Sequence, residues 1–65
     1  MKIILGKKYL STKEVSNRYG FSTKWFEKER YCKRGPVFIK LNQRGRVFYP
    51  MDETDQWFKE NLKEA

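Results

Sequence analysis

Apolar residues recur at helical spacing in the first third of the chain. Val15 and Tyr19 are four residues apart, so a helix would place them on one face. Ser11 and Glu14 have the spacing of a capping box, in which each side chain accepts from the other residue's backbone N–H. We therefore expect a first helix over about residues 11–19, with its apolar face in the core.

A second helix is predicted after a very short connection. Gly20 can adopt the left-handed conformation that ends a helix, and Ser22 can cap the next one. This second helix, over about residues 22–31, is expected to turn Phe26 toward the core. Trp25 either packs beside Phe26 at the rim of the core, which we expect, or is exposed to a partner. Two short helices joined in this way are typical of a helix-turn-helix.

Strand-like alternation follows Gly35 and Pro36. The segment 42–45 has the composition of a turn between two extended runs, so residues 37–49 are expected to form a β-hairpin. Basic residues at its tip would suit a wing that contacts DNA. The alternate positions expected on one face of its first strand are Val37, Ile39 and Leu41.

Helical spacing returns at the end of the chain. Asp52 is a candidate N-cap for a final helix over about residues 52–63, in which Phe58 and Leu62 share one face. We expect Trp57 to anchor this helix in the core. The predicted fold is therefore α+β, a small winged helix-turn-helix with two N-terminal helices, a β-hairpin wing and a C-terminal helix.

Charge is distributed unevenly along residues 1–65, which are expected to form a single domain. Residues 1–51 contain 13 basic and 3 acidic side chains, whereas residues 52–65 contain 2 basic and 5 acidic ones. A basic body with an acidic tail favours a polyanion as partner. The alternative is a small protein whose charges serve only its solubility.

Several kinds of chemistry are disfavoured by composition. Cys32 is the only cysteine and histidine is absent, so neither an internal disulfide nor a typical zinc site is expected. Without histidine or an apolar carboxylate pair, we expect no enzymatic activity and no cofactor. The apolar run in Met1–Leu5 is too short for a signal peptide or a membrane span, so a cytoplasmic location without membrane contact is expected.

Four stretches of the chain, in this order, resemble one family of DNA-binding proteins. The family is that of the small winged helix-turn-helix proteins of the excisionase and AlpA type, relatives of the MerR DNA-binding domain. The resemblance implies a second helix in the major groove and a hairpin wing on the backbone or in the neighbouring minor groove. It is carried by Tyr9–Val15, Tyr19–Ser22, Gly35–Leu41 and Arg46–Tyr49, followed by Asp52 and Trp57.

The resemblance also assigns candidate DNA contacts. Major-groove contacts fall on Thr23, Lys24 and Lys28, and wing contacts on Gln43, Arg44 and Arg46. Where many members carry a small hydroxyl residue and a tyrosine around the position of Phe26, this chain has Trp25 and Glu27, which leaves the orientation of the second helix open. The candidate phosphate contacts are Ser22, Lys7, Lys8, Lys13, Lys33 and Arg34. The alternative is that all of these are solvated surface residues.

The expected function is sequence-specific binding of double-stranded DNA, by an excisionase of a phage or mobile element or by a small transcriptional regulator. Because one small module reads few base pairs, cooperative binding of further copies is expected, with an integrase as a further partner of an excisionase. The alternative is a small protein-interaction factor that inhibits a host or phage enzyme. RNA binding is a third possibility, with Phe38 and Phe48 as the aromatic residues of the strands.

Overall fold

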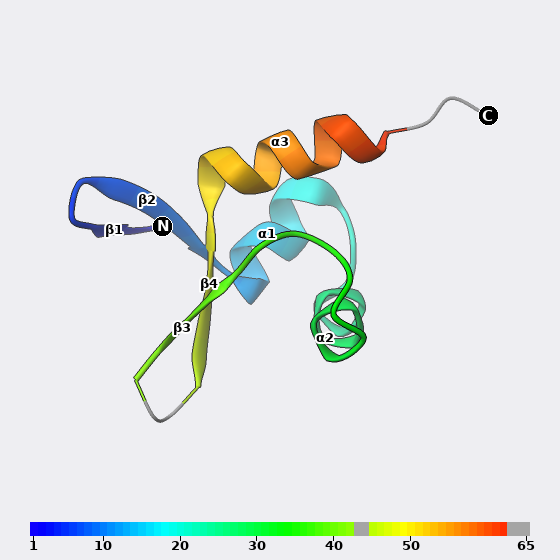
Figure 1. The fold of residues 1–65 in the computed structure, drawn as a ribbon, viewed down its shortest axis with the longest axis horizontal. Helices are drawn as coiled ribbons and strands as arrows, with labels where there is room; N and C mark the ends of the chain where they lie inside the picture. The colour runs from blue at the N-terminus through cyan, green and yellow to red at the C-terminus, as the bar shows by residue number, and fades with distance from the viewer. Residues whose placement is uncertain (43–44, 63–65) are drawn as a thin grey trace.

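The computed structural model describes residues 1–42 and 45–62, which form three helices and a four-stranded antiparallel sheet (Figure 1). The sheet has the strand order β1-β2-β4-β3. In chain order the elements are β1 (Lys2–Ile4), β2 (Lys7–Ser11), α1 (Thr12–Tyr19), α2 (Thr23–Tyr31), β3 (Ile39–Leu41), β4 (Arg46–Pro50) and α3 (Met51–Asn61). The α+β class is confirmed.

The predicted order of elements is wrong at its beginning, because a β-hairpin precedes the first two helices. β1 and β2 pair with Lys2 opposite Tyr9, and Leu5 and Gly6 form the connection between them. β2 in turn pairs with β4, with Leu10 opposite Tyr49. Both strands are too short for periodicity to indicate them, and β2 also depends on its pairing with the distant β4 on its other edge.

Both predicted caps at the start of the first two helices are confirmed. The Glu14 N–H donates to Ser11 Oγ (3.2 Å), and the Ser11 N–H donates to Glu14 Oε1 (2.9 Å). Gly20 is left-handed with φ +79° and ends α1. Ser22 Oγ accepts from the Trp25 N–H (3.1 Å) and starts α2. Two local signals thus set the short turn between α1 and α2.

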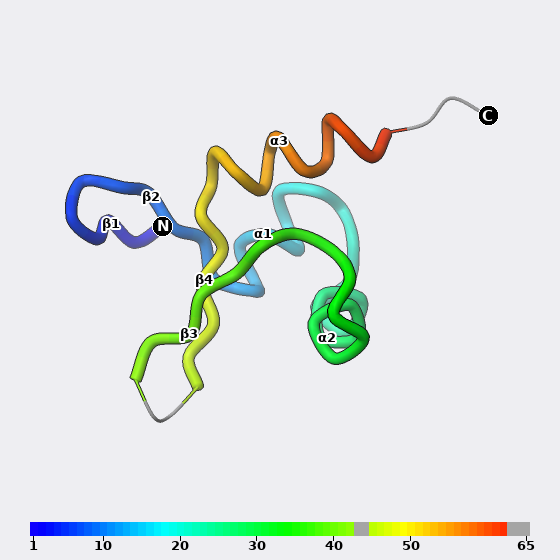
Figure 2. Tube along the Cα trace, viewed as in Figure 1, coloured from blue at the N-terminus to red at the C-terminus, as the bar shows by residue number. Residues whose placement is uncertain are grey.

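The core lies between the sheet and the helices. Its buried members are Leu10, Val15, Phe26 and Tyr49, and Val15 and Phe26 were predicted to face inward. Trp25 packs edge-on against Phe26, with 4.9 Å between ring centroids, as expected. Figure 2 follows the chain from the end of α2 across the molecule into the β3–β4 hairpin, which brings Phe26 and Tyr49 together.

The second hairpin differs in detail from the prediction. β3 begins at Ile39, and Val37 precedes the strand with its side chain exposed. Ile39 and Leu41 do share a face, because they are two residues apart in β3. They lie opposite Phe48 and Arg46 of β4. Phe38 instead packs against the core, 6.2 Å from the ring of Tyr49. Phe38 and Ile39 are thus both half-buried, and Phe38 is the residue of this run whose ring lies near that of Tyr49.

Three expectations for the last helix are wrong. α3 begins at Met51 after Pro50, so Asp52 lies inside the first turn and does not cap it. Trp57 and Phe58 are both half-buried, but only Phe58 packs against the core cluster. Leu62 follows the helix and is 76% exposed. The anchor is Phe58, whose ring stacks on Tyr19 with 4.1 Å between ring centroids and packs against the core cluster.

Candidate nucleic-acid interface

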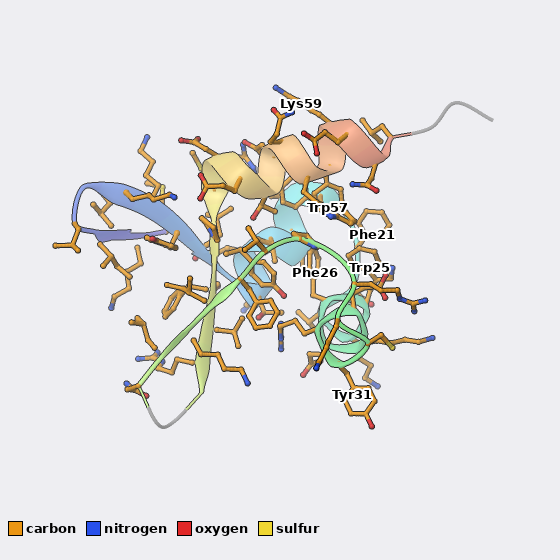
Figure 3. The ribbon with its side chains drawn as sticks, in the orientation of Figure 1. Phe21, Trp25, Phe26, Tyr31, Trp57 and Lys59 are labelled. Carbon is orange, nitrogen blue, oxygen red and sulfur yellow. The ribbon has the colours of Figure 1, made fainter. Side chains whose placement is uncertain are left out.

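The outer side of α2 carries a row of exposed polar and basic residues. Lys24, Lys28 and Tyr31 follow one another at intervals of four and three residues, so they share one helix face. Buried Phe26 on the opposite face holds this row outward. Tyr31 is 90% exposed and points away from the body of the protein (Figure 3). Thr23 and Glu27 are also exposed on α2. The three predicted groove contacts are therefore accessible together.

A basic groove of about 420 Å³ lies where the C-terminal end of α2 meets β3. Four cationic side chains surround it, together with the backbone and apolar side chains of the segment that joins the two elements. Among residues 1–42 and 45–62, no acidic side chain lines it. The groove is lined by Arg30, Lys33, Arg34, Gly35, Pro36, Val37, Phe38 and Lys40.

The turn after α2 holds two of these cations in place. Lys33 and Gly35 both have positive φ, +56° and +86°, and the Arg34 N–H donates to the Glu29 carbonyl at 2.8 Å. A side chain at Gly35 would bring its Cβ within 3.0 Å of Glu29 Cβ, so glycine is required there. Arg34 also approaches the Glu29 carboxylate at 3.4 Å, and its side chain is still mostly exposed. The turn is thus a compact and positively charged corner.

Arg30 connects the groove to the core. Its Nη1 donates to the Tyr49 hydroxyl at 2.7 Å and to Thr12 Oγ1 at 3.2 Å, and its guanidinium lies 5.9 Å from the Phe38 ring centroid. Burial raises the pKa of Tyr49, while the Arg30 hydrogen bond acts against that rise. Arg30 is four residues after Phe26, on the inward side of α2, and this spacing was the signal that the sequence analysis missed.

The remaining predicted contacts have different positions. Arg46 is exposed at the start of β4, opposite Leu41, on the hairpin that borders the groove. Lys13 is exposed on α1, and Ser22 caps α2. Lys7 forms an ion pair with Glu53 of α3 and is therefore not brought to the groove. Lys40 was not among the predicted contacts. The predicted wing residues Gln43 and Arg44 lie outside the described residues.

Opposite charge is concentrated on α3. This helix carries Asp52, Glu53, Asp55 and Glu60 against a single Lys59, which points away from α2 in Figure 3. The Arg18 guanidinium donates to both oxygens of Asp55, at 3.1 and 2.8 Å, and the Tyr19 hydroxyl donates to Asp55 as well. These bonds, first that from Arg18 and then that from Tyr19, hold the pKa of Asp55 below its usual value. Burial, before the bond to Asp55, raises the pKa of Tyr19 to about 12.

Other kinds of site are not observed in the described part of the chain. Residues 1–42 and 45–62 contain no cluster of three or more histidine, cysteine, aspartate or glutamate side chains that could hold a metal ion. Within the same residues, none of the helices has the length and apolar character needed to cross a bilayer. Comparison of the chain with protein-family models, curated proteins and solved structures found no match. Any functional assignment must therefore come from the side chains themselves.

Proposed function

We propose that this protein binds double-stranded DNA as a small winged helix-turn-helix module. In this proposal α2 enters the major groove, and the β3–β4 hairpin is the wing on the flanking backbone or in the adjacent minor groove. The observation that carries the proposal is the cationic groove between these two elements, lined by Arg30, Lys33, Arg34 and Lys40.

The position of the groove fits a phosphate backbone. A helix that occupies the major groove has a sugar–phosphate strand on either side, and here the space beside α2 is bordered by cations from the turn and from β3. Lys33, Arg34 and Lys40 can each neutralise a phosphate and release condensed counterions. Arg30 makes hydrogen bonds to Tyr49 and Thr12, so its role is to hold the floor of the groove.

Base reading is assigned to the exposed row on α2. Lys24 and Lys28 can donate to guanine O6 or N7, and Thr23 can contact a thymine methyl group or hydrogen-bond a base edge. Glu27 would be repelled by phosphate, but its carboxylate can accept from a cytosine amino group. This exposed acid on α2 therefore favours an orientation in which the middle of the helix faces bases and its C-terminal end faces the backbone.

The biological role within this proposal is that of an excisionase of a phage or mobile element, or of a small transcriptional regulator. The resemblance described above supports both roles equally. A DNA-excision assay with an integrase encoded beside this protein separates them: an excisionase stimulates excision there, and a regulator instead changes transcription from a promoter that contains its site.

The DNA-binding proposal is tested by fluorescence anisotropy with a labelled random duplex over a series of salt concentrations. The variant Lys33→Ala/Arg34→Ala/Lys40→Ala should bind more weakly and flatten the slope of log K against log salt by about 2–3, since each phosphate contact contributes about 0.9 to that slope. The matched control is Lys59→Ala, an exposed lysine on α3. An equal effect of both changes, or no binding by the parent protein at low salt, would overturn the proposal.

A further inference from the structure

Arg30 lines the basic groove with a guanidinium of which only one nitrogen is used by the fold. Nη1 carries two of the five N–H donors, and these donate to the Tyr49 hydroxyl at 2.7 Å and to Thr12 Oγ1 at 3.2 Å. The other three donors, one on Nε and two on Nη2, have no acceptor within residues 1–42 and 45–62. Nε–H and one Nη2–H are parallel, so the fold leaves open an edge that can bind two oxygens of one anion.

The open edge of Arg30 is accessible from outside the protein. Among the described residues, no side-chain nitrogen or oxygen is buried without a hydrogen-bond partner, so Nε and Nη2 of this half-buried residue are in contact with solvent. Nη1 is directed at Tyr49 of the core, and the open space that Arg30 lines is the groove. An anion in the groove can therefore reach this edge.

The position of the Arg30 guanidinium is set before any partner binds. Its carbon atom Cζ lies 5.9 Å from the ring centroids of both Phe38 and Tyr49, and the two hydrogen bonds from Nη1 fix its rotation. The side chain of Arg34, in the same groove, is 65% exposed and must give up rotamer freedom to hold a phosphate. Arg30 has lost that freedom on folding, so its contact with an anion has a defined geometry.

The charge of Arg30 is not balanced by a carboxylate in the described part of the chain. Arginines are rarely taken out of water without such a partner, because removal of a charge from water is costly. No carboxylate of residues 1–42 and 45–62 forms an ion pair with Arg30, and the other charged residues of the groove are all cationic. An anion from outside the chain would supply the missing charge, and the planar edge suits a phosphate group.

We propose that the Nε–Nη2 edge of Arg30 binds two oxygens of one phosphate group, and that Tyr49 and Thr12 are positioning residues that hold Arg30 for this contact. The phosphate is assigned to the DNA strand beside α2, and in this respect the proposal rests on the proposed function. Lys33 and Lys40 add charge from exposed side chains, whereas Arg30 fixes where one phosphate lies relative to the core. This contact sets the register of α2 on the DNA backbone.

The first test follows the Nε–H signals of the arginines by NMR at slightly acidic pH. Inorganic phosphate is added at constant ionic strength, and a random duplex is added in a separate titration. The Arg30 signal should move and reach saturation in both titrations. The matched control is Arg18, whose Nε and Nη2 already donate to Asp55 at 3.1 and 2.8 Å, so its signal should stay in place.

The two titrations distinguish a failure of the Arg30 contact from a failure of DNA binding. If the duplex binds by anisotropy without moving the Arg30 signal, the Arg30 contact is wrong and the DNA-binding proposal is unaffected. If inorganic phosphate moves the signal and no duplex binds, the phosphate site is supported, its assignment to DNA is wrong, and the ligand is a free phosphate ester. Equal movement of the Arg30 and Arg18 signals would contradict the proposal.

The second test separates the geometry of Arg30 from its charge. Arg30→Lys keeps the charge and loses the planar edge, so it should weaken duplex binding about tenfold with little change in the salt slope. Lys33→Ala is the comparison, because it removes a charge and should lower the slope by about 1. Each variant is measured at a temperature at which circular dichroism shows it to be folded. Binding by Arg30→Lys that equals that of the parent protein would overturn the proposal.

Tyr49→Phe tests the positioning role, because it removes only the hydroxyl. It should weaken duplex binding in the parent background and cause no further loss in the Arg30→Lys background, where no planar edge remains to be oriented. Thr12→Val, at the less buried of the two acceptors, should behave in the same way and provides the measurement if Tyr49→Phe does not fold. Equal losses in both backgrounds would show that the hydroxyls affect binding only through stability, and their positioning role would then be wrong.

Discussion

The two ends of α2 have opposite surroundings. At its beginning, Trp25 lies among the rings of Phe21, Phe26 and Phe58, so this end is attached to α3 by aromatic packing. At its end, Tyr31 is exposed and is followed by Lys33 and Arg34, which line the basic groove. One end of the same helix is thus used for stability, and the other end presents charge to solvent.

This division solves a problem that is specific to a very small domain. With few residues available for a core, a helix that is to contact a partner along its length must be held by only part of its surface. Here the aromatic cluster around Phe58 and the Arg30 hydrogen bonds to Tyr49 and Thr12 provide that support from the inner side. The exposed lysines are then not required for folding, and substitutions at the two ends should have separable effects.

The largest expected effect is on stability, from Phe58→Ala. Phe58 contacts the rings of Tyr19, Phe21 and Trp57 among others, and removal of such a ring from a core costs about 3–5 kcal/mol. That is comparable to the whole stability of a small domain, so this variant should be largely unfolded. Trp57→Ala should melt cooperatively at a temperature much closer to that of the parent, because Trp57 does not pack against the core cluster as Phe58 does. Thermal melting followed by circular dichroism checks both, and a larger loss from Trp57→Ala would show that the wrong ring was assigned as the anchor.

The next effect should appear in DNA binding without loss of stability. Lys28→Ala and Lys24→Ala should weaken binding to a specific site, obtained by selection from random duplexes, by about 1–3 kcal/mol more than binding to random DNA. Arg46→Ala on the hairpin should weaken both equally and reduce the salt slope by about 1, as expected for a phosphate contact. Competition binding measures these differences. If Lys24→Ala and Lys28→Ala affect both DNAs equally, the two lysines contact phosphates and α2 does not read bases through them.

Local signals in the sequence were sufficient to predict the helices that face the candidate site. The capping box of Ser11 and Glu14, the left-handed Gly20 and the cap at Ser22 depend only on residues within a few positions, and the structure has each of them. The first hairpin was missed because its strands are very short and because β2 is also paired with a distant segment, as Leu10 is with Tyr49. Trp57 was misplaced because it is next to Phe58 in the same helix, and only the packing of α3 on α1 decides which of the two adjacent rings lies against Tyr19.

The candidate site was predictable only in part, for a similar reason. The exposed row on α2 follows from helical spacing, but the groove requires β3 to lie beside the end of α2, and this is a property of the fold. Lys40 was therefore missed, although a lysine in an alternating strand run was visible. Arg30 was missed because an arginine in a basic helix was not considered as an inward residue with hydrogen-bond partners in the core.

The smallest effect concerns the ion pair that closes α1 onto α3. Arg18 and Tyr19 hold the pKa of Asp55 below its usual value. The stability that this carboxylate adds is therefore fully present above the pKa of an aspartate in the unfolded chain, about 3.9. It is lost as the pH falls through the lower pKa of Asp55 in the folded protein. Arg18 is partly exposed, and solvent screening limits the contribution to about 0–1 kcal/mol. Tyr19 remains a protonated donor over this range, since its pKa is raised to about 12.

Asp55→Asn should therefore lower the melting temperature slightly at pH 7 and reduce the further loss of stability between about pH 4 and pH 2, because less of the acid sensitivity remains. The control is Glu60→Gln on the same helix, since Glu60 forms no ion pair within residues 1–42 and 45–62 and accepts only from Gln56. Denaturant titrations at several pH values make the comparison. If the pH dependence of stability is unchanged in Asp55→Asn, the ion pair does not hold α1 against α3. The stacked rings of Tyr19 and Phe58 would then make this contact alone, and the aromatic end of the molecule would need no charge for its stability.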